Sequence, residues 1–246
     1  MSAGSLFTMK TCFEPFALAI VLTAAACGGD PLDPGAGDDP GSGTSTLFVE
    51  GRATAEPNTP NAGDATAFTT EFSIRIGLND APVTTGTVTV ESRFATTTLT
   101  YQADGNNLGH WVGRAADYDE VYRLDIVSGA NEVRGVVVDG PDIHRFTLPT
   151  AGASLDANVA NMIEWDREET ADEASFKAEE IDRISIADTG SYSMAPGSMK
   201  TDQDTARENV LELRRLNRTV PAGAVPGSEL SVSVQQEIQI VALPTP

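Results

Sequence analysis

Residues that carry most enzyme chemistry and most nucleic-acid binding are scarce in this 246-residue chain. It holds two cysteines, two histidines, and 16 Lys and Arg against 36 Asp and Glu, for a formal net charge of −20. Phosphate binding depends on Lys and Arg, so this balance disfavours nucleic acid as a partner. The excess of carboxylates favours solubility and disfavours charge-driven attachment to an anionic membrane surface.

Sequence motifs of the common hydrolases and zinc sites are also absent. The chain has no Gly-x-Ser-x-Gly elbow, no His-Glu-x-x-His pair and no Cys/His metal spacing. An enzyme that relies on imidazole would have to use His110 or His144. Asp142-x-His144 puts both side chains on one side of an extended segment, where they could share a proton or a metal, but two side chains do not define a site. We therefore predict no catalytic, metal-ligating or cofactor-binding residue, and no cofactor.

Three acidic stretches are candidates for cation binding. Asp117-x-Asp119-Glu120 and Asp202-x-Asp204 could supply oxygen ligands to calcium, but neither continues into the calcium-loop pattern. Between residues 164 and 182, nine acidic residues stand against Arg167 and Lys177. This stretch is either a site for a cation or basic partner or a solvated face, and we prefer the solvated face.

An apolar run at residues 16–27 has the length of a signal-peptide core and is shorter than the roughly 20 residues of a membrane span. It ends in Ala24-Ala25-Ala26-Cys27, which resembles the lipobox of bacterial lipoproteins. In that family the leader is cut before the cysteine, whose sulfur carries a diacylglyceryl group. The resemblance implies a signal peptide over 1–26 and a lipid anchor on Cys27. Because Gly28 rather than Asp follows the cysteine, it also implies the outer membrane or cell surface.

An ordinary secretory cleavage site is the alternative, because Ala24-x-Ala26 also fits the A-x-A pattern, and it would release a soluble protein. The start codon, Met1 or Met9, is open as well. Either cleavage removes Cys12, so Cys27 would be the sole cysteine of the mature chain and no intrachain disulfide could form.

The tract over 27–46 is rich in Gly, Pro, Asp and Ser and holds one large apolar residue, Leu32. One such residue does not offset the entropy of ordering the tract, so the composition predicts a disordered tether. A chain of this length has a root-mean-square reach of about 25 Å.

Two folded regions, 47–149 and 150–246, are predicted after the tether. Apolar residues alternate with polar ones in short runs separated by Gly, Asn, Asp and Pro turn signals, which is typical of antiparallel β-sandwiches. In the first region we expect Trp111 in the core. The alternating runs are Phe72/Ile74/Ile76/Leu78, Val88/Val90, Leu99/Tyr101, Tyr122/Leu124/Ile126, Val136/Val138, Ile163/Trp165, Leu211/Leu213, Leu230/Val232/Val234 and Ile238/Ile240.

A short motif in the second region narrows the sandwich type. Asp188-Thr189-Gly190-Ser191-Tyr192 resembles the tyrosine corner of immunoglobulin-like domains. Antibody domains carry a cysteine two residues after that tyrosine, where this chain has Met194. The resemblance is therefore to disulfide-free sandwiches such as fibronectin type III, with Trp165 facing inward. Residues 168–181 fit either a short helix or a loop followed by a strand bearing Phe176.

Two classes of function follow. The preferred hypothesis is a non-catalytic, lipid-anchored protein of the cell envelope that serves as a binding, adhesion or structural module, with a protein or glycan as its ligand. This preference rests on analogy between sandwich folds. The alternative is a secreted or envelope hydrolase with an unfamiliar site near His110 or His144.

Overall fold

The structure, a computed structural model, describes residues 32–104 and 109–244 and consists almost entirely of β-strands. Within those residues there is no α-helix, and one 3-10 turn, η1 (Ala65–Ala67), precedes a strand. The predicted all-β sandwich fold is therefore confirmed. The predicted signal peptide and Cys27 lie outside the described residues.

The strands vary in length from two to 14 residues. They are β1 (Ser42–Gly43), β2 (Leu47–Pro57), β3 (Phe68–Leu78), β4 (Ala81–Pro82), β5 (Thr87–Glu91), β6 (Thr96–Thr98), β7 (Thr100–Gln102), β8 (His110–Ala115), β9 (Val121–Ser128), β10 (Asn131–Asp139), β11 (Phe146–Leu148), β12 (Ser154–Leu155), β13 (Asn161–Trp165), β14 (Glu173–Ala178), β15 (Ile181–Ile186), β16 (Ser191–Met194), β17 (Arg207–Thr219) and β18 (Glu229–Ala242).

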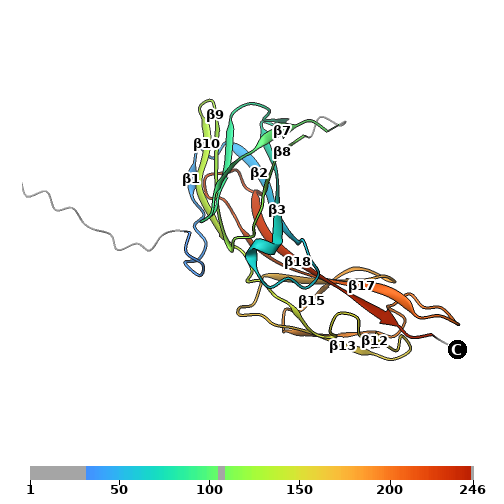
Figure 1. Cartoon of the computed structure of the whole chain (residues 1–246). Helices are drawn as coiled ribbons and strands as arrows, with labels where there is room; N and C mark the ends of the chain where they lie inside the picture. Colours follow the sequence, from blue (N-terminus) through green and yellow to red (C-terminus); the bar gives the residue numbers. More distant parts are fainter. Residues whose placement is uncertain (1–31, 105–108, 245–246) are drawn as a thin grey trace, which may run out of the picture.

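The strands form two sandwiches that share one long sheet (Figure 1). The shared sheet has the order β15-β14-β17-β18-β2-β3-β8-β7. In the first sandwich, the sheet β1-β10-β9-β5-β6 packs against the part of the shared sheet that holds β2, β3 and β8. In the second sandwich, the small sheet β11-β13-β16 packs against the part that holds β14 and β17.

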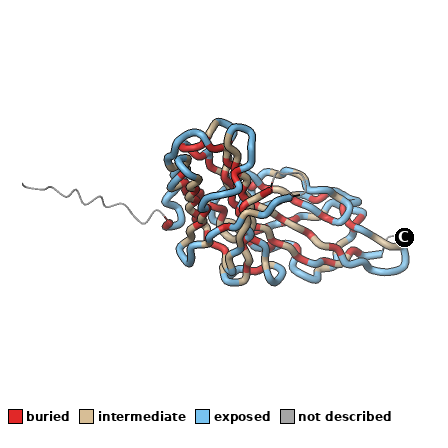
Figure 2. The backbone as a smooth tube through the Cα atoms, turned by 90° about the horizontal axis from the view of Figure 1, so that it is seen from above, coloured by how far each residue is buried: buried red, intermediate tan, exposed pale blue. Residues whose placement is uncertain are grey.

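Each sandwich buries its own cluster of apolar side chains, and buried residues alternate with exposed ones along the strands (Figure 2). Trp111 lies in the first cluster and is 5% exposed, and Trp165 lies in the second and is 4% exposed. Both predicted tryptophan placements are confirmed.

The hairpin β17–β18 runs through both sandwiches. The two strands pair antiparallel along the whole of β17. On β18, Val232 and Val234 pack in the first cluster, whereas Ile238 and Ile240 pack in the second. The sequence predicted separate strands over 230–234 and 238–240, whereas the structure has the single strand β18 over both stretches. The first core therefore includes residues far beyond position 149, where the first folded region was expected to end.

Strand direction departs from the prediction at β18. This strand pairs parallel with β2, from Glu229↔Glu50 to Val234↔Ala55, and parallel with β12 near its other end. The remaining pairings among the described strands are antiparallel, as predicted.

The two alternatives for residues 168–181 are resolved in favour of the strand. Residues 173–178 form β14 between β15 and β17, and Phe176 is fully buried. The helix-like spacing of the alanines arises because Ala174 and Ala178 are inward residues of a strand.

The prediction of a disordered tether is wrong for residues 32–46. Leu32 is 7% exposed and packs with Val121 and Val137. Farther along, β1 pairs with β10. The prediction counted the apolar side chains of this tract but not the backbone hydrogen bonds that a neighbouring strand edge can supply.

Tyrosine-corner geometry occurs in the first sandwich rather than at the predicted position. The Oη of Tyr122, at the start of β9, accepts a hydrogen bond from the backbone N–H of Asp119, three residues upstream, at 2.8 Å. Tyr192 instead pairs with Ile163 and packs its ring against Phe176, with 5.2 Å between ring centroids.

Candidate functional site

Two polar residues occupy inward positions of the β17–β18 hairpin where it passes from one core to the other. Successive inward residues of β17 are Leu211, Leu213 and then Arg215, and β18 places Gln236 between the inward residues of the two clusters. Both polar side chains have 0% exposure. The interior of the junction is therefore polar, although each core beside it is apolar.

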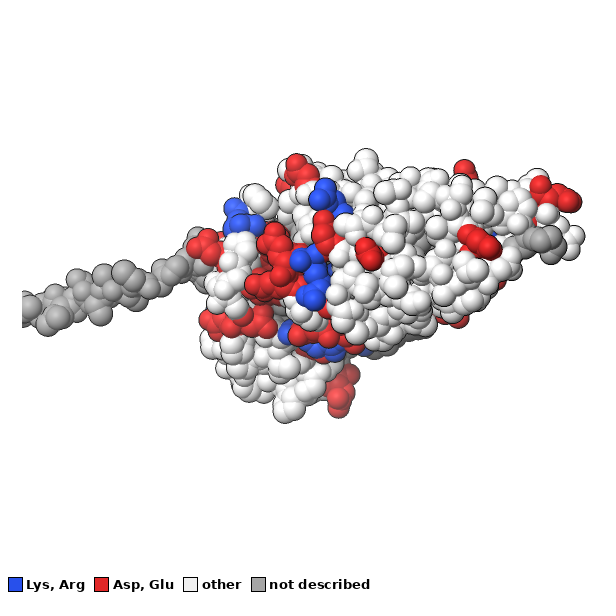
Figure 3. All heavy atoms as spheres, turned by 90° about the horizontal axis from the view of Figure 1, so that it is seen from below, with Lys and Arg blue, Asp and Glu red and all other residues white. Residues whose placement is uncertain are grey.

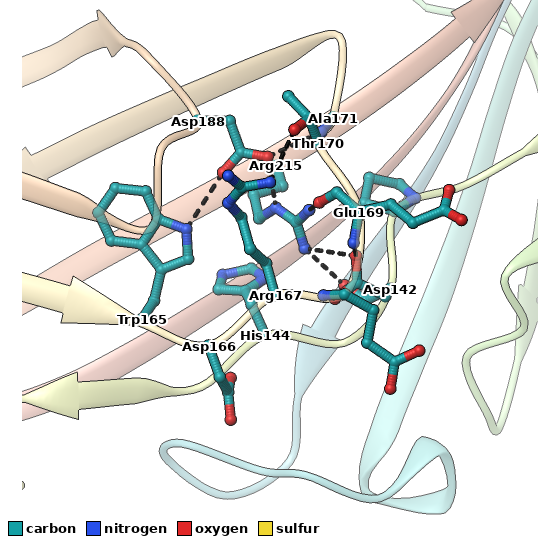
Figure 4. A network of polar contacts seen from close by, with 12 residues as sticks. Asp142, His144, Trp165, Asp166, Arg167, Glu169, Thr170, Ala171, Asp188 and Arg215 are labelled. Carbon is teal, nitrogen blue, oxygen red and sulfur yellow. Dashed lines mark hydrogen bonds and ion pairs between the residues drawn. The ribbon is translucent and has the colours of Figure 1, made fainter.

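Arg215 joins three segments through its guanidinium (Figure 4). Its Nε donates to Asp188 Oδ2 at 3.1 Å, and its Nη1 donates to both the carbonyl and Oδ1 of Asp142 at 3.0 Å. Its Nη2 donates to the carbonyl of Glu169. Two carboxylates thus neutralise a buried cation whose hydrogen bonds also satisfy two carbonyl groups.

Both carboxylates have further donors. Asp188 accepts from the indole Nε1 of Trp165 at 3.1 Å and from the backbone N–H of Ala171 at 2.7 Å. Asp142 accepts from the backbone N–H groups of Glu168 and Glu169 at 2.8 and 3.3 Å. The aspartate of the predicted tyrosine-corner motif is therefore an ion-pair partner of Arg215.

A loop of the first sandwich completes the junction. Asn61 donates through Nδ2 to the carbonyl of Phe146 at 3.1 Å, and its Oδ1 accepts from the Phe146 N–H at 2.7 Å. The amide of Gln236 donates to the carbonyl of Ala62. Side chains and backbone from both sandwiches thus interlock here.

A cavity of about 170 Å³ opens beside this network. It is rich in carboxylates, and acidic side chains gather on the face seen in Figure 3, toward the end at which the described chain begins. Burial raises the pKa of Glu120 and of Asp139, and nearby carboxylates add to the shift for both. The cavity is lined by Pro34, Gly35, Glu120, Asp139, Gly140, Pro141, Asp142, Glu168, Glu169, Thr170, Ala171, Arg215 and Asn217.

His144 lies beside the network and is fully buried. Its Nε2 is 3.3 Å from the carbonyl of Leu213. Burial, and then the charge of Arg215, lower its pKa to about 4. Asp142 and His144 therefore have separate partners, and the structure does not bring them to a shared metal or proton.

His110 lies on β8 in the first sandwich, where its Nδ1 is 3.4 Å from Ser73 Oγ. The structure thus places the two histidines in different surroundings. The acidic pairs also have protein partners. Asp119 accepts from the backbone N–H and the Nε of Arg93 at 2.6 and 2.9 Å, and Asp202 forms an ion pair with Arg207 at 2.6 Å.

A second hollow, of about 480 Å³, lies beside the β3–β4 turn of the first sandwich. Phe48, Pro82 and Pro226 line it together with Arg75. Over the part of the chain that the structure describes, no group of three or more His, Cys, Asp or Glu residues is placed to hold a metal ion. Nor do residues 32–104 and 109–244 contain a helix with the length and apolar character of a membrane span.

Comparison with protein-family models and with curated proteins found no match to this chain. The junction is therefore interpreted from its own chemistry. Its central residue, Arg215, was not singled out from the sequence. The sequence does contain a signal for it: Leu211 and Leu213 set the inward-facing positions of the strand, and the next inward position, where an apolar residue is expected, holds an arginine.

Proposed function

We propose that the chain is a non-catalytic module of the cell envelope, anchored by lipid on Cys27 and built as a rigid spacer of two immunoglobulin-like sandwiches. The observation that carries the proposal is the junction. Domains joined by a flexible linker usually move relative to each other, and few contacts cross between them. Here two strands cross without a break, and hydrogen bonds of Arg215 and Asn61 also join segments of the two sandwiches beside them.

The arrangement of the chain ends supports a spacer role. Leu32, at the start of the described chain, packs near the junction-facing ends of β9 and β10, and the described C-terminal end lies at the far end of the second sandwich (Figure 1). A chain held near Cys27 would therefore extend the second sandwich away from its attachment point. The outer membrane or the cell surface is the proposed location.

The state of His144 favours this role over the hydrolase alternative at that residue. A general base has to reach substrate and to titrate near the working pH. His144 does neither, because it is fully buried and its pKa lies near 4. The tyrosine corner at Tyr122 supports the immunoglobulin-like assignment of the first sandwich, and a protein or glycan remains the proposed ligand class.

The anchor is tested by expressing the full chain in a bacterium with radiolabelled palmitate. Wild type is expected to incorporate label and to yield an N-terminal peptide that begins with diacylated or triacylated Cys27. Cys27→Ala should abolish labelling, and the matched Cys12→Ala variant should retain it because the leader is removed. An unmodified N-terminus on a released, soluble protein would contradict the anchor.

Rigidity is tested with spin labels on the purified lipidated protein, whose Cys27 thiol is blocked by the lipid. Cysteines replacing Ala130 and Asp204, which are exposed and lie in different sandwiches, would carry the labels. A spacer predicts one narrow distance distribution, which Arg215→Ala should broaden. A broad distribution in the otherwise wild-type protein would contradict the spacer role.

A further inference from the structure

Residues 32–46, which we call the strap, run along the outer edge of the first sandwich. The strap begins at the buried Leu32 and then forms a bridge between Asp39 and Val137, with hydrogen bonds of 3.2 and 2.8 Å between their backbones. It ends in β1, which pairs with β10 at Ser42↔Arg134 and Gly43↔Val133. Without the strap, β10 would be the edge strand of the five-stranded sheet.

A second set of backbone hydrogen bonds holds the strap on the side opposite β10. The N–H of Ala222 donates to the carbonyl of Pro40 at 2.8 Å, and the N–H of Ser45 donates to the carbonyl of Gly223 at 2.9 Å. The strap therefore lies in a slot between β10 and the loop that joins β17 to β18. Hydrogen bonds on both sides satisfy backbone groups that water would otherwise have to satisfy.

Glycines allow the backbone of the strap to lie very close to the backbones on either side of the slot. A Cβ on Gly41 would lie 2.3 Å from the carbonyl oxygen of Arg134, and one on Gly43 would lie 2.3 Å from that of Glu132. A Cβ on Gly223 would lie 2.1 Å from the carbonyl carbon of Ser42. These contacts are to backbone atoms, so no side chain can move aside to relieve them. At these positions glycine permits close packing rather than chain flexibility.

The forces on the strap are small and partly opposed. Docking buries one large apolar side chain and pairs a two-residue strand. The strap also brings Asp38 close to Asp139, at the end of β10. Asp139 accepts from the Gly35 N–H at 3.1 Å, and its own N–H donates to Asp38 Oδ1 at 2.8 Å, so carboxylates of like charge lie side by side. Segments with so few buried contacts open at lower free energy than core strands.

We propose that the strap is a docked segment that opens without unfolding of the sandwich and thereby switches the anchor between two lengths. Docked, it covers the edge of β10 and leaves four residues between Cys27 and Leu32, whose Cα atoms can then be at most about 18 Å apart. Open, it lengthens the tether to the whole tract before Leu47. The statement on length rests on the proposed lipid anchor, whereas docking and opening do not.

The test is hydrogen exchange of backbone amides in the full mature protein, with Gly41→Ala and Gly37→Ala as the matched pair. Both glycines have positive φ, at 70° and 85°, so both variants carry the same strain of a non-glycine residue. Only at Gly41 would the new Cβ meet backbone, since nothing lies within 4 Å of a Cβ on Gly37. The probes are the strap-dependent amides of Asp39, Thr44 and Val137, with Ile126 of β9 as the core reference.

In the wild type, the strap-dependent amides should be protected but should exchange faster than Ile126. In Gly41→Ala they should exchange about ten-fold faster or more than in Gly37→Ala, with Ile126 unchanged. Strap amides that exchange only together with Ile126 would overturn the proposal, as would equal effects of the two variants. Exchange is read equally well on lipidated and unlipidated protein, so failure of the anchor and failure of the strap are distinguishable.

Discussion

The two sandwiches share a sheet but are filled in different ways. In the first, aromatic rings meet in sequence across the core: Phe68 packs on Tyr118, Tyr118 on Tyr122, and Tyr122 edge-on against Phe72 at 5.5 Å. The second has a smaller apolar cluster and, at its junction end, the fully buried Arg215 between two carboxylates. The first core is held by apolar area and aromatic contacts, and the second depends in addition on a fully buried cation, whereas Arg93, which pairs with the buried Asp119 of the first sandwich, is itself partly exposed.

The two halves should therefore respond differently to the loss of a single side-chain contact. Loss of an apolar contact is graded, because the neighbours relax and fill part of the space. Loss of one partner from a buried ion pair is abrupt, because the remaining charge stays buried without compensation. The chain has one tryptophan in each cluster, so Trp111→Phe and Trp165→Phe backgrounds give separate fluorescence reports on the two halves.

The largest effect is expected for Arg215→Ala. Removing the guanidinium leaves the buried Asp188 and the half-buried Asp142 without a cation, which should lower the free energy of unfolding by about 3 to 5 kcal/mol. Urea titration should show the loss first through Trp165, whose indole donates to Asp188. Because the hairpin joins the cores, wild type should unfold in one transition at both tryptophans, and the variant should separate them.

Arg218→Ala is the control for that variant. Arg218 lies on β17, as Arg215 does, and pairs with Glu173 of β14 and Glu229 of β18. Its side chain is 38% exposed, so its loss should cost less than about 1 kcal/mol. Equal effects of Arg215→Ala and Arg218→Ala would mean that the buried network does not stabilise the second sandwich.

The next effect concerns how the free energy of unfolding depends on pH, through the buried His144. The pKa of His144 falls from 6.5 to about 4 on folding, so the unfolded chain takes up a proton that the folded chain does not. Its contribution to stability is complete above pH 6.5 and is lost as the pH falls toward 4, by roughly 3 kcal/mol in total. His144→Leu should flatten the stability profile in that window, and a slope that stays as steep as in wild type would contradict this assignment.

The junction carboxylates act in the opposite direction. Glu120 and Asp139 have raised pKa values in the folded protein, so each lowers stability at neutral pH, and this penalty disappears as the pH falls through the raised pKa. Glu120→Gln with Asp139→Asn should therefore steepen the loss of stability on acidification. A stability profile identical to that of wild type would contradict the raised pKa values of both carboxylates.

Much of the fold could be predicted from alternation alone. The period of two placed β3, β5, β9, β13 and β17 and predicted both tryptophans to be buried, because apolar residues on one face of a strand need a core. The same pattern cannot say which core a residue joins. Val234 and Ile238 follow one phase of β18, yet they face different sandwiches. That assignment depends on long-range pairing.

Composition gave a wrong prediction where a residue type has two structural roles, as glycine and arginine do in this chain. Glycine in the strap indicates a flexible tract by composition, but Gly41 and Gly43 allow close backbone packing that becomes visible only with the strand beside them. Arginine at an inward position indicates an exposed strand end or an error of phase, unless its buried partners are known. Arg215 finds them 27 and 73 positions away, at Asp188 and Asp142.

The smallest effect tests the tyrosine corner, which lies in the first sandwich at Tyr122 rather than at Tyr192. Tyr122→Phe keeps the ring but removes the acceptor for the Asp119 N–H and the contact with Thr70 Oγ1 at 3.2 Å. A buried N–H without a partner should cost about 1 to 2 kcal/mol, seen first through Trp111 in urea titration. Tyr192→Phe is the matched control and should cost less, since the main contact of Tyr192 is its ring packing on Phe176. If Tyr192→Phe lowered the free energy of unfolding more than Tyr122→Phe, the stabilising tyrosine hydroxyl would lie in the second sandwich. The contrast between a core held by aromatic contacts and one that depends on an ion pair would then be wrong.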